Sequence, residues 1–120
     1  MKQKKVLSFV LALCLVFALS VTALAASFSD VSSSHWANDE ISDVVSRGIF
    51  LGTSATTFEP EADMTRAMFV TVLSRLAAAD VDDSAATNFT DVATGVWYTG
   101  AVAWGTSNNI VQGLSATTFG

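Results

Sequence analysis

Residues 64–76 read Met-Thr-Arg-Ala-Met-Phe-Val-Thr-Val-Leu-Ser-Arg-Leu, and the remainder of the chain is organised around them. The segment predicts an amphipathic helix that continues through 77–79. Thr65 suits the N-cap, because its hydroxyl can accept a free backbone N–H of the first turn. Arg66 then falls where a cation meets the positive end of the helix dipole, a mildly unfavourable place that hints at a ligand. The apolar face, spaced at helical intervals, is expected to consist of Phe69, Val72, Leu73 and Leu76.

The first 26 residues predict a signal peptide rather than part of the fold. Lysines precede an apolar run, and Ala23-Leu24-Ala25 supplies the small-x-small pattern of a signal peptidase site. A membrane-spanning helix needs about 20 apolar residues, and this run is shorter. We therefore expect an exported protein with no membrane contact after the signal is cleaved.

Without this leader the chain is strongly acidic. Three arginines stand against eleven Asp and Glu residues, which gives a net charge of −8. Nucleic acids and anionic membrane surfaces are bound through Lys and Arg, so neither is an expected partner. The single cysteine, Cys14, belongs to the leader, and the mature chain therefore offers no disulfide or thiol chemistry.

The chain repeats itself at an offset of 61 residues. Positions 28–59 and 89–120 share 12 identities in 32 without a gap, including Ser-Ala-Thr-Thr-Phe in both copies. Each copy predicts a turn-like Phe-x-Asp-Val stretch whose Asp bonds nearby backbone N–H groups. A helix follows, at 36–46 and 97–107, with Trp36 and Trp97 on its apolar face, and it ends at Gly48 or at Asn108-Asn109. A polar loop comes next, and its phenylalanine, Phe58 or Phe119, is expected to fold back onto the core.

These segments predict an all-α, mainly helical fold of tandem units, each a helix–loop–helix with short extended or turn segments. The first unit spans 27–79, the acidic segment 80–88 is a linker, and the second unit spans 89–120. The second copy of the Thr-Arg helix would begin after residue 120. We therefore expect the second unit to be truncated and poorly packed.

The order of these motifs resembles the S-layer homology domain of bacterial surface proteins. The first copy carries Phe-x-Asp-Val at 28–31, His35-Trp36-Ala37, Gly52, Phe58-Glu59-Pro60 and Thr65-Arg66-Ala67, and the second carries the same order as far as Phe119. The resemblance implies a non-catalytic anchor of helical units, usually three, that pack around a common axis. It implies a location at the bacterial cell wall and binding of secondary cell-wall polysaccharide, often pyruvylated, in the grooves between units. Further units of the same chain or of neighbouring subunits are the other implied partners.

The predicted binding residues come from both copies. The resemblance makes Arg66 a main ligand contact, and its guanidinium can donate two hydrogen bonds to one carboxylate. Tryptophans can stack on sugar rings, although one per unit at the same place is more typical of a core residue. Both roles are compatible if one ring face is buried and an edge stays open. Aspartates in this context are more typical of turns than of sugar ligands. The full set is Arg66, Thr65, Trp36, Asp30, Trp97 and Asp91.

Met68 and His35 both depart from the expected pattern. Met68 stands where the family usually has Glu, so half of the capping box with Thr65 should be missing, at a cost of about 1 kcal/mol. His35 has no counterpart in the second copy and no evident partner, and no chemistry is assigned to it.

The sequence gives little support for a metal site or for a catalytic pair of carboxylates. Asp80-x-Asp82-x-Ser84 with Asp91 faintly resembles a calcium loop, but Ala85 stands where that loop needs Gly, so neither metal nor cofactor is predicted. Glu59 and Glu61 are expected to be solvated rather than to act as a glycosidase pair. Two alternatives stay open: the targeting end of an exported polysaccharide-degrading enzyme whose catalytic domain lies beyond residue 120, and an S-layer lattice subunit.

Overall fold

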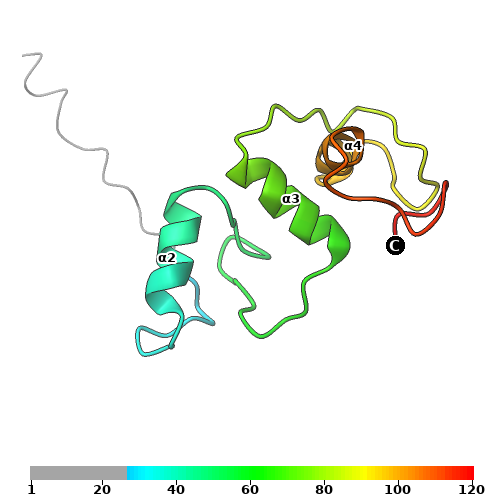
Figure 1. Cartoon of the computed structure of the whole chain (residues 1–120). Helices are drawn as coiled ribbons and strands as arrows, with labels where there is room; N and C mark the ends of the chain where they lie inside the picture. Colours follow the sequence, from blue (N-terminus) through cyan, green and yellow to red (C-terminus); the bar gives the residue numbers. More distant parts are fainter. Residues whose placement is uncertain (1–26) are drawn as a thin grey trace, which may run out of the picture.

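The structure is a computed structural model that describes residues 27–120, and the predicted signal peptide at 1–26 lies outside them. Within this range the chain forms three helices and no strand, so the all-α prediction is confirmed. The helices are α2 (Asn38–Ser46), α3 (Arg66–Leu76) and α4 (Thr99–Ser107) (Figure 1). None of these described helices is both long enough and apolar enough to cross a membrane.

Helices α2 and α4 begin two residues later than the sequence predicted. In each, the first helical side chain reaches back to a carbonyl six residues upstream. Asn38 Nδ2 donates to the Ser32 carbonyl at 3.2 Å, and Thr99 Oγ1 donates to the Ala93 carbonyl at 2.7 Å. These bonds hold the preceding residues in a turn, so the helix starts only at Asn38 and Thr99.

All three helices end in the same motif. The second residue past each helix adopts a left-handed backbone, with φ of 68° at Gly48, 48° at Ala78 and 57° at Asn109. At Gly48, its N–H bonds the Val45 carbonyl at 2.9 Å and the next N–H bonds the Val44 carbonyl at 3.0 Å, which is the Schellman pattern. The predicted stops at Gly48 and Asn109 are confirmed. The predicted continuation through 77–79 is wrong, because the backbone reverses at Ala78.

Each copy encloses an apolar cluster around two phenylalanine rings. The centroids of Phe28 and Phe58 lie 5.4 Å apart in the first copy, and those of Phe89 and Phe119 lie 5.5 Å apart in the second. The loop phenylalanines therefore fold back onto the core as predicted. The other buried members are Ala37 and Ile41 in the first copy and Val92, Ala101 and Val102 in the second, joined there by Val70 of α3.

Helix α3 packs against α4 (Figure 1). The residues that α3 buries are not those of the predicted face. Phe69 and Leu76 are 52% and 58% exposed. The two helices approach closely, since a Cβ on Gly105 of α4 would lie only 2.6 Å from Val70 Cγ2. Large side chains do not fit such a contact, and small ones take their place. The buried residues of α3 are Val70, Thr71 and Ser74, and both hydroxyls donate to carbonyls of their own helix.

The second copy is well packed, so the expectation of poor packing is wrong. Helix α3, which follows the loop of the first copy, covers α4, and Val70 and Val102 are completely buried in one cluster. The acidic linker adds a second support. Asp83 accepts the Gly100 N–H at 3.0 Å at the positive start of α4, where a carboxylate is favoured.

Gly113 should be intolerant of any side chain. A Cβ there would overlap the Phe89 ring and lie 2.6 Å from the Ser115 carbonyl oxygen. We expect Gly113→Ala to lower the free energy of unfolding by about 1–3 kcal/mol, the usual cost of overpacking. Urea unfolding followed by circular dichroism measures the change. Gln112→Ala, an exposed neighbour, is the control, and equal midpoints for the two variants would contradict the packing described.

Candidate functional site

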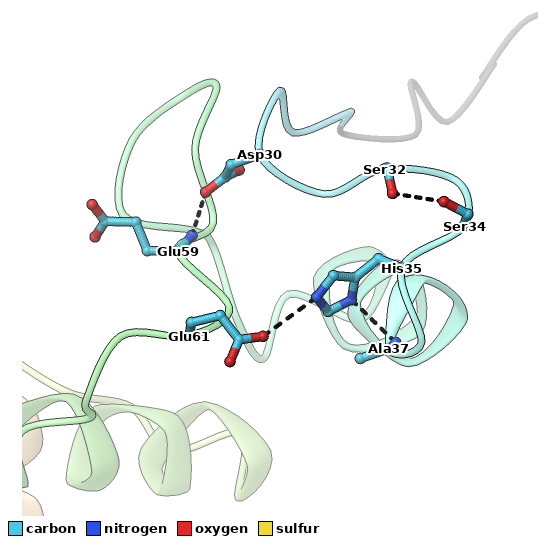
Figure 2. Close-up of polar contacts among 7 residues, drawn as sticks. All are labelled: Asp30, Ser32, Ser34, His35, Ala37, Glu59 and Glu61. Atoms are coloured by element: carbon cyan, nitrogen blue, oxygen red, sulfur yellow. Dashed lines mark hydrogen bonds and ion pairs between the residues drawn. The ribbon is translucent and has the colours of Figure 1, made fainter.

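An aspartate closes the polar loop of each copy. The Asp30 carboxylate accepts the backbone N–H of Phe58 at 2.9 Å. It also accepts the backbone N–H of Glu59 at 2.7 Å (Figure 2). The prediction of bonds to nearby N–H groups is wrong, because these partners lie 28 and 29 residues along the chain. We call this arrangement the aspartate clasp. In the second copy, Asp91 accepts from Phe119 and Gly120, both at 2.9 Å.

The clasp favours ionised aspartates. The N–H groups of Phe58 and Glu59 hold the pKa of Asp30 below its ordinary value. Those of Gly120 and Phe119 do the same to the pKa of Asp91. Donors aimed at a carboxylate stabilise its charged form, so both clasps are at full strength at neutral pH.

Arg66 joins the two copies at the start of α3. Its Nη2 donates to the Gln112 carbonyl, and its guanidinium carbon lies 4.8 Å from the centroid of the Phe119 ring. Asp91 in turn holds the N–H of Phe119, so the three residues form one connected cluster. Arg66 is exposed and takes part in neither ion pair found among residues 27–120. A guanidinium carries five donors, and most of those of Arg66 therefore remain available to an anion.

Thr65 caps α3 and thereby positions Arg66. Its Oγ1 accepts the Met68 N–H at 3.2 Å, and Met68 Sδ lies 3.5 Å from the Thr65 nitrogen. The prediction that half of the capping box is missing is therefore wrong. Sulfur is a weak acceptor, but here it occupies the place that a Glu carboxylate usually takes.

Neither repeat-related tryptophan is a core residue. Trp36 is 83% exposed and stacks on His35, with ring centroids 5.8 Å apart. Trp97 is 54% exposed and meets Tyr98 edge-on. The core interpretation is wrong, because the small neighbour Ala37 is buried in place of Trp36. Trp97 lines a groove beside the first copy's loop, and Trp36 does not line that groove.

His35 has a partner that the sequence did not reveal. Its Nε2 lies 3.6 Å from Glu61 Oε1, and its Nδ1 accepts the Ala37 N–H at 3.2 Å (Figure 2). The neutral tautomer with its proton on Nε2 satisfies both contacts. The pair ties the start of α2 to the segment before α3, and Glu61 itself is largely exposed, as expected.

The structure therefore divides the six predicted binding residues. Arg66, Thr65 and Asp91 come together at the junction of the copies, and Trp97 faces a groove that Arg66 does not line. Trp36 and Asp30 belong to the first copy, where Asp30 has its clasp. Within residues 27–120 no group of three or more His, Cys, Asp or Glu side chains could hold a metal ion, and Asp82 instead accepts two bonds from Ser84.

Comparison with known proteins shows which family the repeat resembles. The sequence profile of the S-layer homology domain matches residues 27–68 and 88–120. The chain is 32% identical over 93 residues to an S-layer protein of Bacillus thuringiensis subsp. finitimus and 31% identical over 93 residues to S-layer protein sap of Bacillus anthracis. It is also 33% identical over 87 residues to an amylopullulanase of Thermoanaerobacterium thermosulfurigenes.

These matches cover most of the chain and little of its relatives. They take in 78% of this chain for both S-layer proteins and 72% for the amylopullulanase. The chain spans only 11% of the length of either S-layer protein and 5% of the amylopullulanase. No solved structure gives a significant match.

The clasps should make stability depend on pH in the acid range. An aspartate whose pKa is lower in the folded state than in the unfolded state stabilises the fold. Its contribution is complete at pH values above the ordinary pKa of 3.8, and it is lost as the pH falls through the pKa of the folded state. We expect the thermal midpoint of the wild type to fall steeply from about pH 5 to pH 2.5, and that of Asp30→Asn/Asp91→Asn to fall less. Asp80→Asn, on the exposed linker, is the control. Parallel curves for all three proteins would contradict the clasp.

Proposed function

The chain belongs to the S-layer homology domain family, and from this premise we propose that it anchors an exported protein to the bacterial cell wall by binding secondary cell-wall polysaccharide. Membership places the protein at the cell surface and makes this region a non-catalytic module. The observation that carries the polysaccharide proposal is the Arg66 cluster at the junction of the copies. Its chemistry suits an acidic sugar or a pyruvyl group.

The charges of the chain support Arg66 as the anion contact. Only three arginines lie outside the first 26 residues, against eleven carboxylates. Arg47 already pairs with Asp43 at 3.2 Å, and Arg75 is half-buried. Arg66 is thus the one exposed arginine in the described range without a carboxylate beside it. Salt screens the diffuse repulsion of an anionic polymer beyond about 8–10 Å, so a local arginine contact can outweigh it.

The setting of Arg66 also favours an anion. The Phe119 ring supports one face of the guanidinium, and the Gln112 carbonyl fixes one edge, which limits the freedom lost on binding. The start of α3 adds the positive end of a helix dipole. A carboxylate that accepts two hydrogen bonds from the guanidinium would meet both sources of positive potential at once.

The type of full-length protein does not alter this proposal. Some relatives are named S-layer protein, and others are named amylopullulanase, endoglucanase or endo-1,4-beta-xylanase A. In either type the matched region would act as the wall anchor. Whether this chain belongs to a lattice subunit or to an exported polysaccharide-degrading enzyme is therefore a separate question.

Binding to purified Gram-positive sacculi tests the proposal. We expect the wild type to sediment with sacculi and to lose this binding once the secondary polysaccharide has been extracted. Arg66→Ala should weaken binding by about 10- to 100-fold, the loss typical of hydrogen bonds to a charged group. Arg66→Lys should give an intermediate value, because it keeps the charge and loses the planar fork.

Arg47→Ala is the matched control, since that arginine is exposed and already paired. Thermal midpoints of all variants separate loss of binding from loss of fold. Equal binding by wild type and folded Arg66→Ala would overturn the role of Arg66. Binding that survives extraction would show that the wall ligand is a different polymer.

A further inference from the structure

Two methionines, Met64 and Met68, lie on either side of the N-cap of helix α3. No other methionine occurs between residues 27 and 120. Both line a groove of about 520 Å³ between the closing loop of the first copy, α3 and Trp97. Met64 is 48% exposed and Met68 is half-buried, so a small solute in the groove can reach both sulfurs.

The sulfur of Met68 occupies an acceptor position in the capping box. Its Sδ lies 3.5 Å from the Thr65 nitrogen, and Thr65 Oγ1 accepts the Met68 N–H at 3.2 Å. Within residues 27–120 the Thr65 N–H has no other hydrogen-bond partner. Because a thioether is a weak acceptor, this half of the box has the right geometry but contributes little free energy.

Oxidation would turn this sulfur into a stronger acceptor group. A lone pair of the thioether sulfur attacks one oxygen of a hydroperoxide, a sulfur–oxygen bond forms and the O–O bond breaks. The proton of the transferred oxygen moves to the departing oxygen, which leaves as water when the oxidant is hydrogen peroxide. The sulfur is oxidised by two electrons and the peroxide is reduced. The product, methionine sulfoxide, is polar, and its oxygen accepts hydrogen bonds better than the sulfur does.

The surroundings of Met68 suit a sulfoxide. The added oxygen would lie one bond beyond the sulfur, and a small rotation of the side chain would aim it at the Thr65 N–H. A Glu or Gln side-chain oxygen takes this position in a complete capping box. Met68 belongs to neither buried apolar cluster of the described residues and lines the groove instead, so the new oxygen need not enter the core.

We propose that Met68 is a peroxide-sensitive capping residue, whose oxidation to the sulfoxide completes the capping box and strengthens the start of α3. A chain at the cell surface lies outside the reducing cytosol, where peroxides can reach it. Methionine sulfoxide reductases, one for each epimer, return the sulfoxide to the thioether. This inference goes beyond wall anchoring and does not depend on the wall ligand.

Hydrogen peroxide acting on the Met64→Leu variant tests the proposal, because Met68 is then the only methionine in residues 27–120. Peptide mass mapping verifies that one oxygen has been added at Met68. We expect the thermal midpoint to rise by about 2–6 °C, the shift that a capping bond gives in a domain of this size. Exchange of the Thr65 amide hydrogen should slow by about threefold or more. Reductases for both epimers should restore both values.

Met68→Leu is the matched control, since only Met64 can then be oxidised, and its midpoint should not rise with peroxide. Met68→Gln carries a side-chain oxygen permanently. It should therefore show the raised midpoint and the slow Thr65 exchange before any treatment, and peroxide should not raise its midpoint further.

Three results would overturn the proposal. One is a midpoint of oxidised Met64→Leu that stays the same or falls, or an unchanged Thr65 exchange rate in that protein. Another is an equal rise of the midpoint in Met68→Leu. The third is resistance of Met68 to peroxide under conditions that convert Met64 of the wild type.

Discussion

The aspartate clasp is the interaction on which each copy of the repeat depends. By holding two backbone N–H groups of its loop, Asp91 places the Phe119 ring against Phe89 and under the Arg66 guanidinium. The close approach of the Phe89 ring then requires a glycine at position 113. The position of one buried ring pair, the need for one glycine and the position of one exposed arginine thus depend on a single carboxylate. In the first copy the same clasp fixes the loop that carries Glu59 to the groove.

The second constraint is the contact between α3 and α4. Because α3 follows the first copy's loop and packs on the second copy's helix, the two copies share a core through Val70. The first turn of the same helix carries Arg66 to the second copy's loop. Met68, in that first turn, and Arg75, near the end of the helix, line the groove beside Trp97. The proposed Arg66 contact therefore lies at the junction, so a polysaccharide bound there would touch both copies.

Local signals predicted the parts of the fold that depend on local bonds. The repeat, the turn-forming ends at Gly48 and Asn109, and the return of Phe58 and Phe119 to the core were all readable from the sequence. Hydrophobic periodicity failed on α3, because it assigns the largest apolar side chains to the core. The close approach at Gly105 instead brings Val70 into the contact, and the residues that α3 buries are Val70, Thr71 and Ser74. Trp36 and Trp97 were also wrongly assigned to the core, because the same rule gives large apolar side chains a buried position.

The clasp partners lie too far along the chain for local reasoning, although the equal spacing from Asp to Phe in both copies was a usable signal. The groove was not predictable, since α3 and Trp97 line it together only because α3 packs on α4.

Amide hydrogen exchange of the chain, with and without secondary wall polysaccharide, tests the central claim most directly. The claim is that the polymer binds at the junction of the two copies. The account predicts that the polymer slows exchange in the first turn of α3 and in residues 112–120, while residues 38–46 of α2 exchange as before. Slowed exchange confined to α2, or unchanged exchange throughout a folded chain, would contradict it.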